Sequence, residues 1–179
     1  KNAITSTLLV QSGWTGLDEA LEGPRTLFHA RAQTARGRSM APPLVLGKEI
    51  LGANIKKWCV GSPAQAPLDA VQALLPSLPA MNLLASIQVA IRSDEAFIVD
   101  NRDMPNICLQ HLVALYLVDR KLTFDSVHDA QRMEDPQVRA VRNNIQLIPS
   151  KDLMNSGGRQ AIVDITTTDG QTLHKHIQH

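Results

Sequence analysis

Aromatic residues, cysteines and net charge are all scarce in this chain. Phe, Trp and Tyr make up 3% of the 179 residues, so we expect a core built mainly from Leu, Ile, Val and Ala. The formal net charge of +1 excludes the basic excess of a nucleic-acid-binding domain. The two cysteines, Cys59 and Cys108, lack the spacing of metal ligands, which predicts reduced, buried thiols and no metal site.

Long apolar runs are missing as well. No stretch approaches the roughly 20 apolar residues that a membrane-spanning helix needs, and no signal peptide is recognisable. We therefore expect a cytoplasmic protein without a membrane partner. The chain does have 44% hydrophobic and 20% charged residues, which is the usual balance of a globular domain.

The first 47 residues differ in pattern from the rest. Asn2–Gln11 is apolar at helical spacing and ends near Gly13, which suits a left-handed helix terminator. Leu17–Leu21 predicts a second short helix, whereas Phe28–Leu46 lacks periodicity, as expected of a linker or surface loop. Since the chain starts within a helix and ends on a strand-like segment, we expect a piece of a longer protein, with residues 1–47 as the tail of a helical domain.

Residues 48–179 predict a small α+β domain with an antiparallel or mixed sheet and packed helices. Period-two and helical patterns give strands at Ile50–Cys59, Ala85–Ile91 (continued at Glu95–Val99), Asn144–Ile148 and within Gln160–Ile177, and helices at Pro63–Leu75, Asn106–Val118, Ser126–Met133 and Pro136–Val141. Pro67 should bend its helix or remove a hydrogen bond, and Pro149 should end its strand. Asp169-Gly170 predicts a type I′ turn in the last hairpin.

The run Asp100–Val138 is the most informative part of the sequence. It contains a polar loop with a proline, a nearly all-apolar helix and two short capped helices. Such an apolar helix must be buried on every side, yet Gln110 and His111 lie within it. Buried polar side chains need partners, and these gather at domain contacts and active sites.

Several segments, in this order, resemble the MmgE/PrpD family. Lys1–Gly23, with its GWTGLDEALEG, is similar to a helical segment that ends in a Gly-x-Thr-Gly turn. Ile55–Ala70, IKKWCVGSPAQAPLDA, is similar to the start of the family's second domain. Asn101–Pro105 and the helix after it resemble an Arg/Lys-x-x-Pro loop with its buried helix. Leu122–Val138 resembles the family's short helix with an Asp-Pro start.

The resemblance implies a large helical domain paired with a smaller α+β lid domain, and an active site between them. This chain would hold the tail of the first and most of the lid. The implied partners are the missing helical domain, a small polycarboxylate substrate and a second copy in a homodimer, and no cofactor or metal is implied. Family reactions remove a proton next to a carboxylate and then dehydrate, decarboxylate or epimerise, which requires a base and cations where charge develops. Gly61 stands where the decarboxylase branch has His, which disfavours decarboxylation.

Two residues are candidates for catalysis, Lys56 from the resemblance and His111 from its place in the buried helix. Lys56 matches a lysine at the start of the lid that binds or polarises the substrate, although the residues alone also suit an exposed lysine on a strand edge. Lys57, a candidate substrate-binding residue, would point the other way on a strand, so one of the pair faces the site. His111 would act as an acid or hydrogen-bond donor, and its alternative is a core histidine bonded to a backbone carbonyl.

Two further residues are candidates for substrate binding. Arg102 could hold a carboxylate with its planar guanidinium or pair instead with Asp100 or Asp103. Gln110 carries the same two interpretations as its neighbour His111. Two functions therefore remain open beside a lyase or isomerase. One is a non-catalytic, truncated α+β interaction or ligand-binding module, and the other is a ligand-binding or dimerisation domain of the ACT type.

Overall fold

The structure is a computed structural model that describes residues 2–15, 55–155 and 158–178. The chain divides into two compact units, Lys1–Ala53 and Asn54–His179. The helix predicted at Leu17–Leu21, the linker at Phe28–Leu46 and the boundary between residues 47 and 48 lie outside the described residues.

The first unit contains helix α1, Asn2–Gln11, as the sequence predicts. The Trp14 N–H donates to the Leu9 carbonyl and the Gly13 N–H to the Val10 carbonyl, both at 3.0 Å. These two bonds form a Schellman motif, in which the residue after the C-cap adopts a positive φ. Gly13 does so, with φ 93°, because it has no Cβ to oppose it.

The second unit is built on a four-stranded mixed sheet with the order β2-β1-β3-β4. Strand β1 (Leu84–Arg92) is central, parallel to β2 (Ile145–Ser150) and antiparallel to β3 (Gln160–Thr167). β3 pairs antiparallel with β4 (Thr172–Gln178) at the other edge. The predicted α+β fold with a mixed sheet is therefore confirmed.

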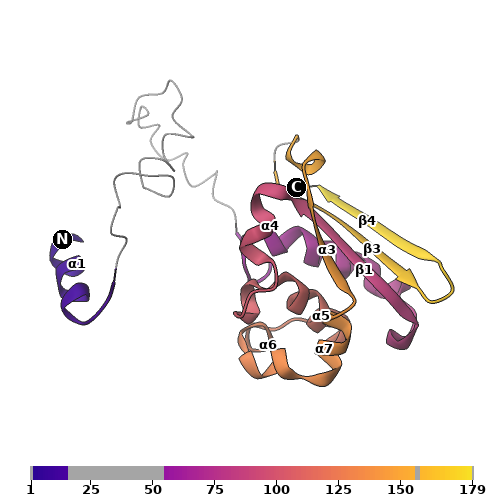
Figure 1. The fold of residues 1–179 in the computed structure, drawn as a ribbon, viewed down its shortest axis with the longest axis horizontal. Coiled ribbons are helices and arrows are strands. Elements are labelled where there is room, and N and C mark those ends of the chain that lie inside the picture. The colour runs from indigo at the N-terminus through magenta and orange to yellow at the C-terminus, as the bar shows by residue number, and fades with distance from the viewer. Residues whose placement is uncertain (1, 16–54, 156–157, 179) are drawn as a thin grey trace. The chain divides into compact units, whose positions relative to one another are not determined.

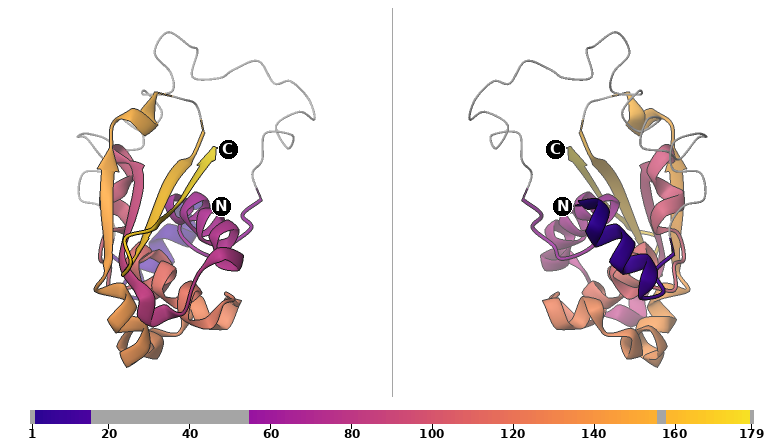
Figure 2. Two further views of the ribbon diagram at one scale, coloured as in Figure 1. Left: turned by 90° about the vertical axis from the view of Figure 1, so that its right-hand side faces the viewer. Right: turned by 90° about the vertical axis from the view of Figure 1, so that its left-hand side faces the viewer.

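Helices cover one face of this sheet. α3 (Gln65–Leu74) packs against β3 and β4, and α5 (Leu109–Asp119) packs against β2, α3 and α7 (Pro136–Arg142). α6 and α7 lie at one end of the unit and α4 toward the other (Figures 1 and 2). Two further α-helices are α4 (Ser93–Val99) and α6 (Phe124–His128). Short 3₁₀ turns connect the elements: η2 (Ser62–Ala64), η3 (Leu75–Ser77), η4 (Met81–Leu83), η5 (Pro105–Ile107), η6 (Ala130–Glu134) and η7 (Asp152–Met154).

The core of the unit centres on α5. Every residue from Leu109 to Leu117 is buried, which confirms the prediction of a helix enclosed on all sides. The sheet contributes the alternate residues of β1 and β3 that face the helices, among them Ile87, Val89, Val163 and Ile165.

Two segments predicted as strands have another conformation. Glu95–Val99 belongs to α4, whose first turn contains Asp94 and Glu95. Carboxylates at that end interact favourably with the helix dipole, which favours a helix over a continued strand. The described part of Ile50–Cys59, residues 55–59, is irregular, and the backbone N–H and carbonyl of Trp58 bond to the Gln65 side chain.

Contrary to the prediction, neither Pro67 nor Pro149 interrupts the element in which it lies. α3 begins at Gln65, so Pro67 lies in the first turn, where a backbone N–H has no partner within the helix. Pro149 lies within β2, which continues to Ser150. β2 is an edge strand, and an edge tolerates a residue without an N–H.

The β3–β4 hairpin is confirmed, but its turn is not of type I′. The strands are joined by a four-residue loop, Thr168–Gln171, in which Gly170 has φ 86° and Asp169 does not have a positive φ. A type I′ turn needs a positive φ at both central residues. The Asp169 carboxylate instead accepts hydrogen bonds from the Thr167 hydroxyl and the Gln171 N–H, which favour the longer loop and lower the pKa of Asp169.

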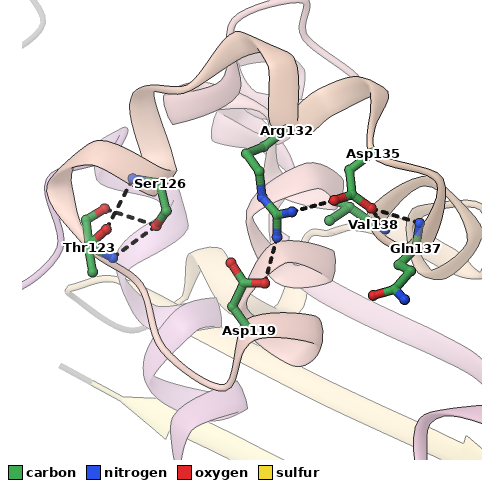
Figure 3. A network of polar contacts seen from close by, with 7 residues as sticks. All are labelled: Asp119, Thr123, Ser126, Arg132, Asp135, Gln137 and Val138. Carbon is green, nitrogen blue, oxygen red and sulfur yellow. Dashed lines mark hydrogen bonds and ion pairs between the residues drawn. The ribbon is translucent and has the colours of Figure 1, made fainter.

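A charged network joins the end of α5 to the start of α7 (Figure 3). Arg132 of η6 lies 2.5 Å from the Asp119 carboxylate and also pairs with Asp135. Asp135 caps α7, as predicted for an Asp-Pro start, by accepting the N–H groups of Gln137 and Val138. These N–H bonds, together with Arg132, lower the pKa of Asp135.

The helix predicted at Ser126–Met133 is instead two elements, α6 and the 3₁₀ turn η6, and α6 begins at Phe124. Its N-cap is Thr123, which forms a reciprocal capping box with Ser126 (Figure 3). The box satisfies two backbone N–H groups that the first turn leaves unpaired.

Replacing Arg132 by Met tests how much the network contributes to the free energy of unfolding. Arg132 is 27% exposed and pairs with two carboxylates from different segments, so we expect the free energy of unfolding to fall by about 1–2 kcal/mol. Arg139→Met is the matched control, because Arg139 forms an exposed pair with Glu134 and should change the value by less than about 0.5 kcal/mol. Equal effects in urea denaturation would contradict the prediction.

Candidate functional site

Trp58 determines how the segment Lys56–Gly61 lies on the unit. The Gln65 side chain accepts the Trp58 N–H at 3.1 Å and donates to its carbonyl at 2.9 Å. The indole N–H donates to Asp69 at 3.0 Å, and the ring packs edge-on against Tyr116, with 5.3 Å between centroids. Because both polar backbone groups of Trp58 are bonded to α3, the segment around it is held to that helix.

The two lysines before Trp58 have different surroundings. Lys57 Nζ lies 2.7 Å from Asp69 Oδ1 and 2.5 Å from Gln72 Oε1, so a carboxylate balances its charge. Lys56 Nζ donates to the Val60 carbonyl at 3.0 Å. Among the described residues, no carboxylate pairs with Lys56, and its exposed ammonium group is available to an anion from solution.

The loop of residues 100–107 lies beside this segment. The Gly61 N–H donates to the Asn106 carbonyl at 2.9 Å. A Cβ at position 61 would come within 3.3 Å of Ile107 Cγ2, so the missing side chain permits the close approach. One peptide group, between Val60 and Gly61, therefore contacts Lys56 through its carbonyl and the loop through its N–H.

Gln110 holds the start of that loop. Its side chain is 2% exposed, and its Oε1 accepts the Asn101 N–H at 3.0 Å while its Nε2 donates to Asp100 Oδ1 at 2.6 Å. Asn101 has φ 42°, in the left-handed region that residues with a side chain seldom adopt. Both ends of the Gln110 amide are thus bonded to the chain itself. The contact of Gln110 with substrate stays a prediction. In the structure, Gln110 holds the backbone at Asn101, the residue before Arg102.

Two arginines lie at this loop. Arg102 is exposed, and within the described part of the chain it pairs with neither Asp100 nor Asp103. Arg142, at the end of α7, donates through Nη2 to Asn101 Oδ1 at 3.4 Å and has no carboxylate partner among the described residues. No sequence pattern pointed to Arg142, because it is 41 residues from Asn101 and only the packing of α7 brings it there. Lys56, Arg102 and Arg142 thus lie on three segments that hydrogen bonds join, and we call these three residues the cationic corner.

His111 is fully buried, and within the described structure neither of its ring nitrogens has a hydrogen-bond partner. Burial lowers the pKa of His111 to about 4, with further lowering by Arg142 and Arg132 and an opposing effect of Asp129. The imidazole is therefore neutral near pH 7. It has no access to solvent, and its catalytic role stays a prediction.

Two surface hollows are lined by other residues. One, of about 300 Å³, is formed by the turn after α3 and the β3–β4 loop, with Leu78, Leu83 and Asp169 among its lining residues. The other, of about 540 Å³, surrounds Phe124 and His128. Neither contains a predicted site residue.

The remaining sequence predictions concern thiols, metals and membranes. Cys108 is buried as predicted, whereas Cys59 is exposed. Within the described ranges, no three His, Cys, Asp or Glu side chains gather in a way that could hold a metal ion. The helices of the described residues include none with the length and apolar character to cross a membrane.

Gln110→Leu tests the role of the buried amide. The change leaves the Asn101 N–H and the Asp100 carboxylate without their buried partner, so we expect the free energy of unfolding to fall by about 1–3 kcal/mol. Gln137→Leu, at an exposed position on α7, is the control and should change stability by less than about 0.5 kcal/mol. Similar values for the two variants would show that the Gln110 bonds contribute little.

His111 predicts a loss of stability in acid. A histidine with a pKa near 6.5 when unfolded and about 4 when folded binds its proton first in the unfolded state. Stability should therefore fall as the pH drops from about 6.5 to 4, by about 3 kcal/mol in total, and this contribution should be constant outside that window. His111→Leu removes two unpartnered nitrogens and should flatten this part of the profile, with stability near pH 7 unchanged or higher. Identical profiles for both proteins would refute the assignment.

Comparison with models of protein families matches residues 58–179 to the MmgE/PrpD C-terminal domain. Comparison with curated proteins gives no match. The matched region includes the whole sheet, the 100–107 loop and Arg142, and it begins just after Lys56 and Lys57. Because this match covers well over half of the chain, the chain belongs to the MmgE/PrpD family, as the sequence resemblance indicated, and residues 58–179 are its C-terminal domain.

Proposed function

We propose that this chain is the lid portion of a metal-independent lyase or isomerase that acts on a small di- or tricarboxylic acid. The observation that supports it is the cationic corner. Arg92, Arg132 and Arg139 each pair with a carboxylate of the chain, whereas within the described structure the three cations of the corner do not. Cations that lack a carboxylate partner among the described residues are suited to an anionic ligand.

The proposed chemistry begins with removal of a proton from the carbon next to a substrate carboxylate. The electron pair moves toward that carboxylate, and Lys56 stabilises the charge that develops there. Arg102 holds a carboxylate through two parallel N–H···O bonds. A hydroxyl group on the adjacent carbon then leaves, with a proton, as water. In an isomerase the carbon is instead protonated again on its other face.

The base for this reaction is expected from the helical domain. His111, the histidine that the sequence suggested as an acid, is enclosed in the core and therefore cannot reach a substrate. We propose that the helical domain closes over the corner, and that the enzyme is a homodimer in the cytoplasm.

Exposed apolar side chains support a closing contact of this kind. Phe97 and Ile98 of α4, just before the 100–107 loop, are 71% and 42% exposed, and Met104 within the loop is 58% exposed. Large apolar side chains that are exposed to this degree suit a surface that another domain or protein covers.

A non-catalytic interaction or ligand-binding module is the second candidate. It is favoured by one observation, the enclosure of His111, because an isolated lid then lacks the imidazole predicted as its acid or base. The two candidates differ in what loss of Lys56 does to turnover.

Lys56→Ala should lower the turnover of 2-methylcitrate by about 100-fold or more in the enzyme formed by this chain and its helical domain, since an electrostatic contact to the developing charge is lost. Lys57→Ala is the matched control, because Asp69 and Gln72 already bind its ammonium group, and turnover should change little. Steady-state kinetics measure both variants, and circular dichroism checks their folding. Unchanged turnover in Lys56→Ala would remove this residue from the site.

A further inference from the structure

We propose that Arg142 is a further substrate-binding residue, which with Arg102 binds a carboxylate remote from the reacting one. The corner would then select di- and tricarboxylates over monocarboxylates. This inference rests on the proposed function and extends it to a residue that the sequence did not indicate.

The hydrogen bonding of Arg142 leaves it available to a ligand. A guanidinium has five N–H donors, and the contact of Arg142 with Asn101 is a single long bond of 3.4 Å to a neutral amide oxygen. Arg139, one turn earlier on α7, is instead bound to Glu134 at 3.1 Å. Two arginines of one short helix thus differ in charge balance, and the unbalanced one is the one at the corner.

The surroundings of Arg142 strengthen its attraction for an anion. Arg142 is half-buried, and α7 is anchored in the core by Val138, which is fully buried. His111 of α5 lies on the core side and is neutral near pH 7, so it does not compete for an anion. A charge at the edge of an apolar core interacts more strongly with a partner than a fully hydrated charge does.

Asn101 directs Arg142 toward the loop. Its Nδ2 donates to Asp100 Oδ1 at 3.2 Å, which leaves its Oδ1 to accept from Arg142. Its backbone is held at φ 42°, in the left-handed region, by a hydrogen bond from its N–H to the buried Gln110 side chain. These bonds fix Asn101 at a position where it contacts Arg142 in space and precedes Arg102 in the chain.

The charge of the corner matches a ligand with more than one carboxylate. Lys56 can engage the reacting carboxylate through its ammonium group, while the guanidinium groups of Arg102 and Arg142 together hold a second carboxylate. A monocarboxylate would leave at least one cation without a counter-charge, so its binding should gain little from Arg142.

The test is a nitrogen-15 NMR titration of the whole 179-residue chain with citrate, and with acetate at matched ionic strength. Citrate should shift the Nε–Hε signals of Arg142 and Arg102 and the amide signal of Asn101. Arg142→Gln should weaken citrate binding by about tenfold and leave acetate binding unchanged, whereas Arg139→Gln should bind citrate as the unaltered chain does. If Arg142→Gln does not fold, Arg142→Lys and the Nε–Hε signal of the unaltered chain provide the same reading.

Three results would overturn the inference. Unchanged citrate affinity in Arg142→Gln, combined with weaker binding in Lys56→Ala, would remove Arg142 and leave the proposed function standing. Equal weakening in Arg142→Gln and Arg139→Gln would indicate a general effect of net charge. Absence of any citrate-dependent shift at Asn101, Arg102 and Arg142 would overturn the inference, whereas the proposed function is tested separately by the turnover of Lys56→Ala.

Discussion

The burial of α5 on every side is the constraint from which the rest of the domain follows. The sheet and α3 cover part of this helix, and α7 with the neighbouring 3₁₀ turns covers another part. Complete burial requires a partner for each polar side chain that the helix carries. Gln110 finds its partners in Asp100 and Asn101, whereas both ring nitrogens of His111 are left unpaired within the described structure. Gln110 thus holds the adjacent loop, whereas His111 is expected to lower the stability of the domain in acid.

The loop connects this core to the proposed site. Since Gln110 bonds to the loop from within the core, the conformation of Asn101 depends on how α5 is packed. The segment that contains Lys56 lies against the other end of the same loop, where the Gly61 N–H donates to the Asn106 carbonyl. The cationic corner therefore does not stand on a free surface loop. It is held by α3 through Trp58, by α5 through Gln110 and by α7 through Arg142.

The charges of the domain are distributed in keeping with this proposal. Where an ion pair has a structural use, as in the contact of Arg132 with Asp119 and Asp135, it joins the ends of neighbouring helices. Lys57 is likewise engaged by Asp69, although it adjoins Lys56 in the chain. Unbalanced cations at the corner cost little while they are hydrated, and they become useful when a carboxylate ligand replaces the water.

Local sequence was enough to predict the elements whose signals lie within a few residues. The Asp135-Pro136 start of α7, the apolar pattern of α5 and the alternation of β3 and β4 each depend on neighbours in the chain. The family resemblance likewise indicated the α+β domain and drew attention to Lys56. Tertiary structure decided what local signals left open. Examples are the helix at Glu95–Val99 and the start of α3 at Gln65, which places Pro67 in the first turn. Others are the enclosure of His111 and the contact of Arg142 with Asn101. Periodicity and capping act over one or two turns, whereas burial and charge pairing depend on residues that only the packed fold brings together.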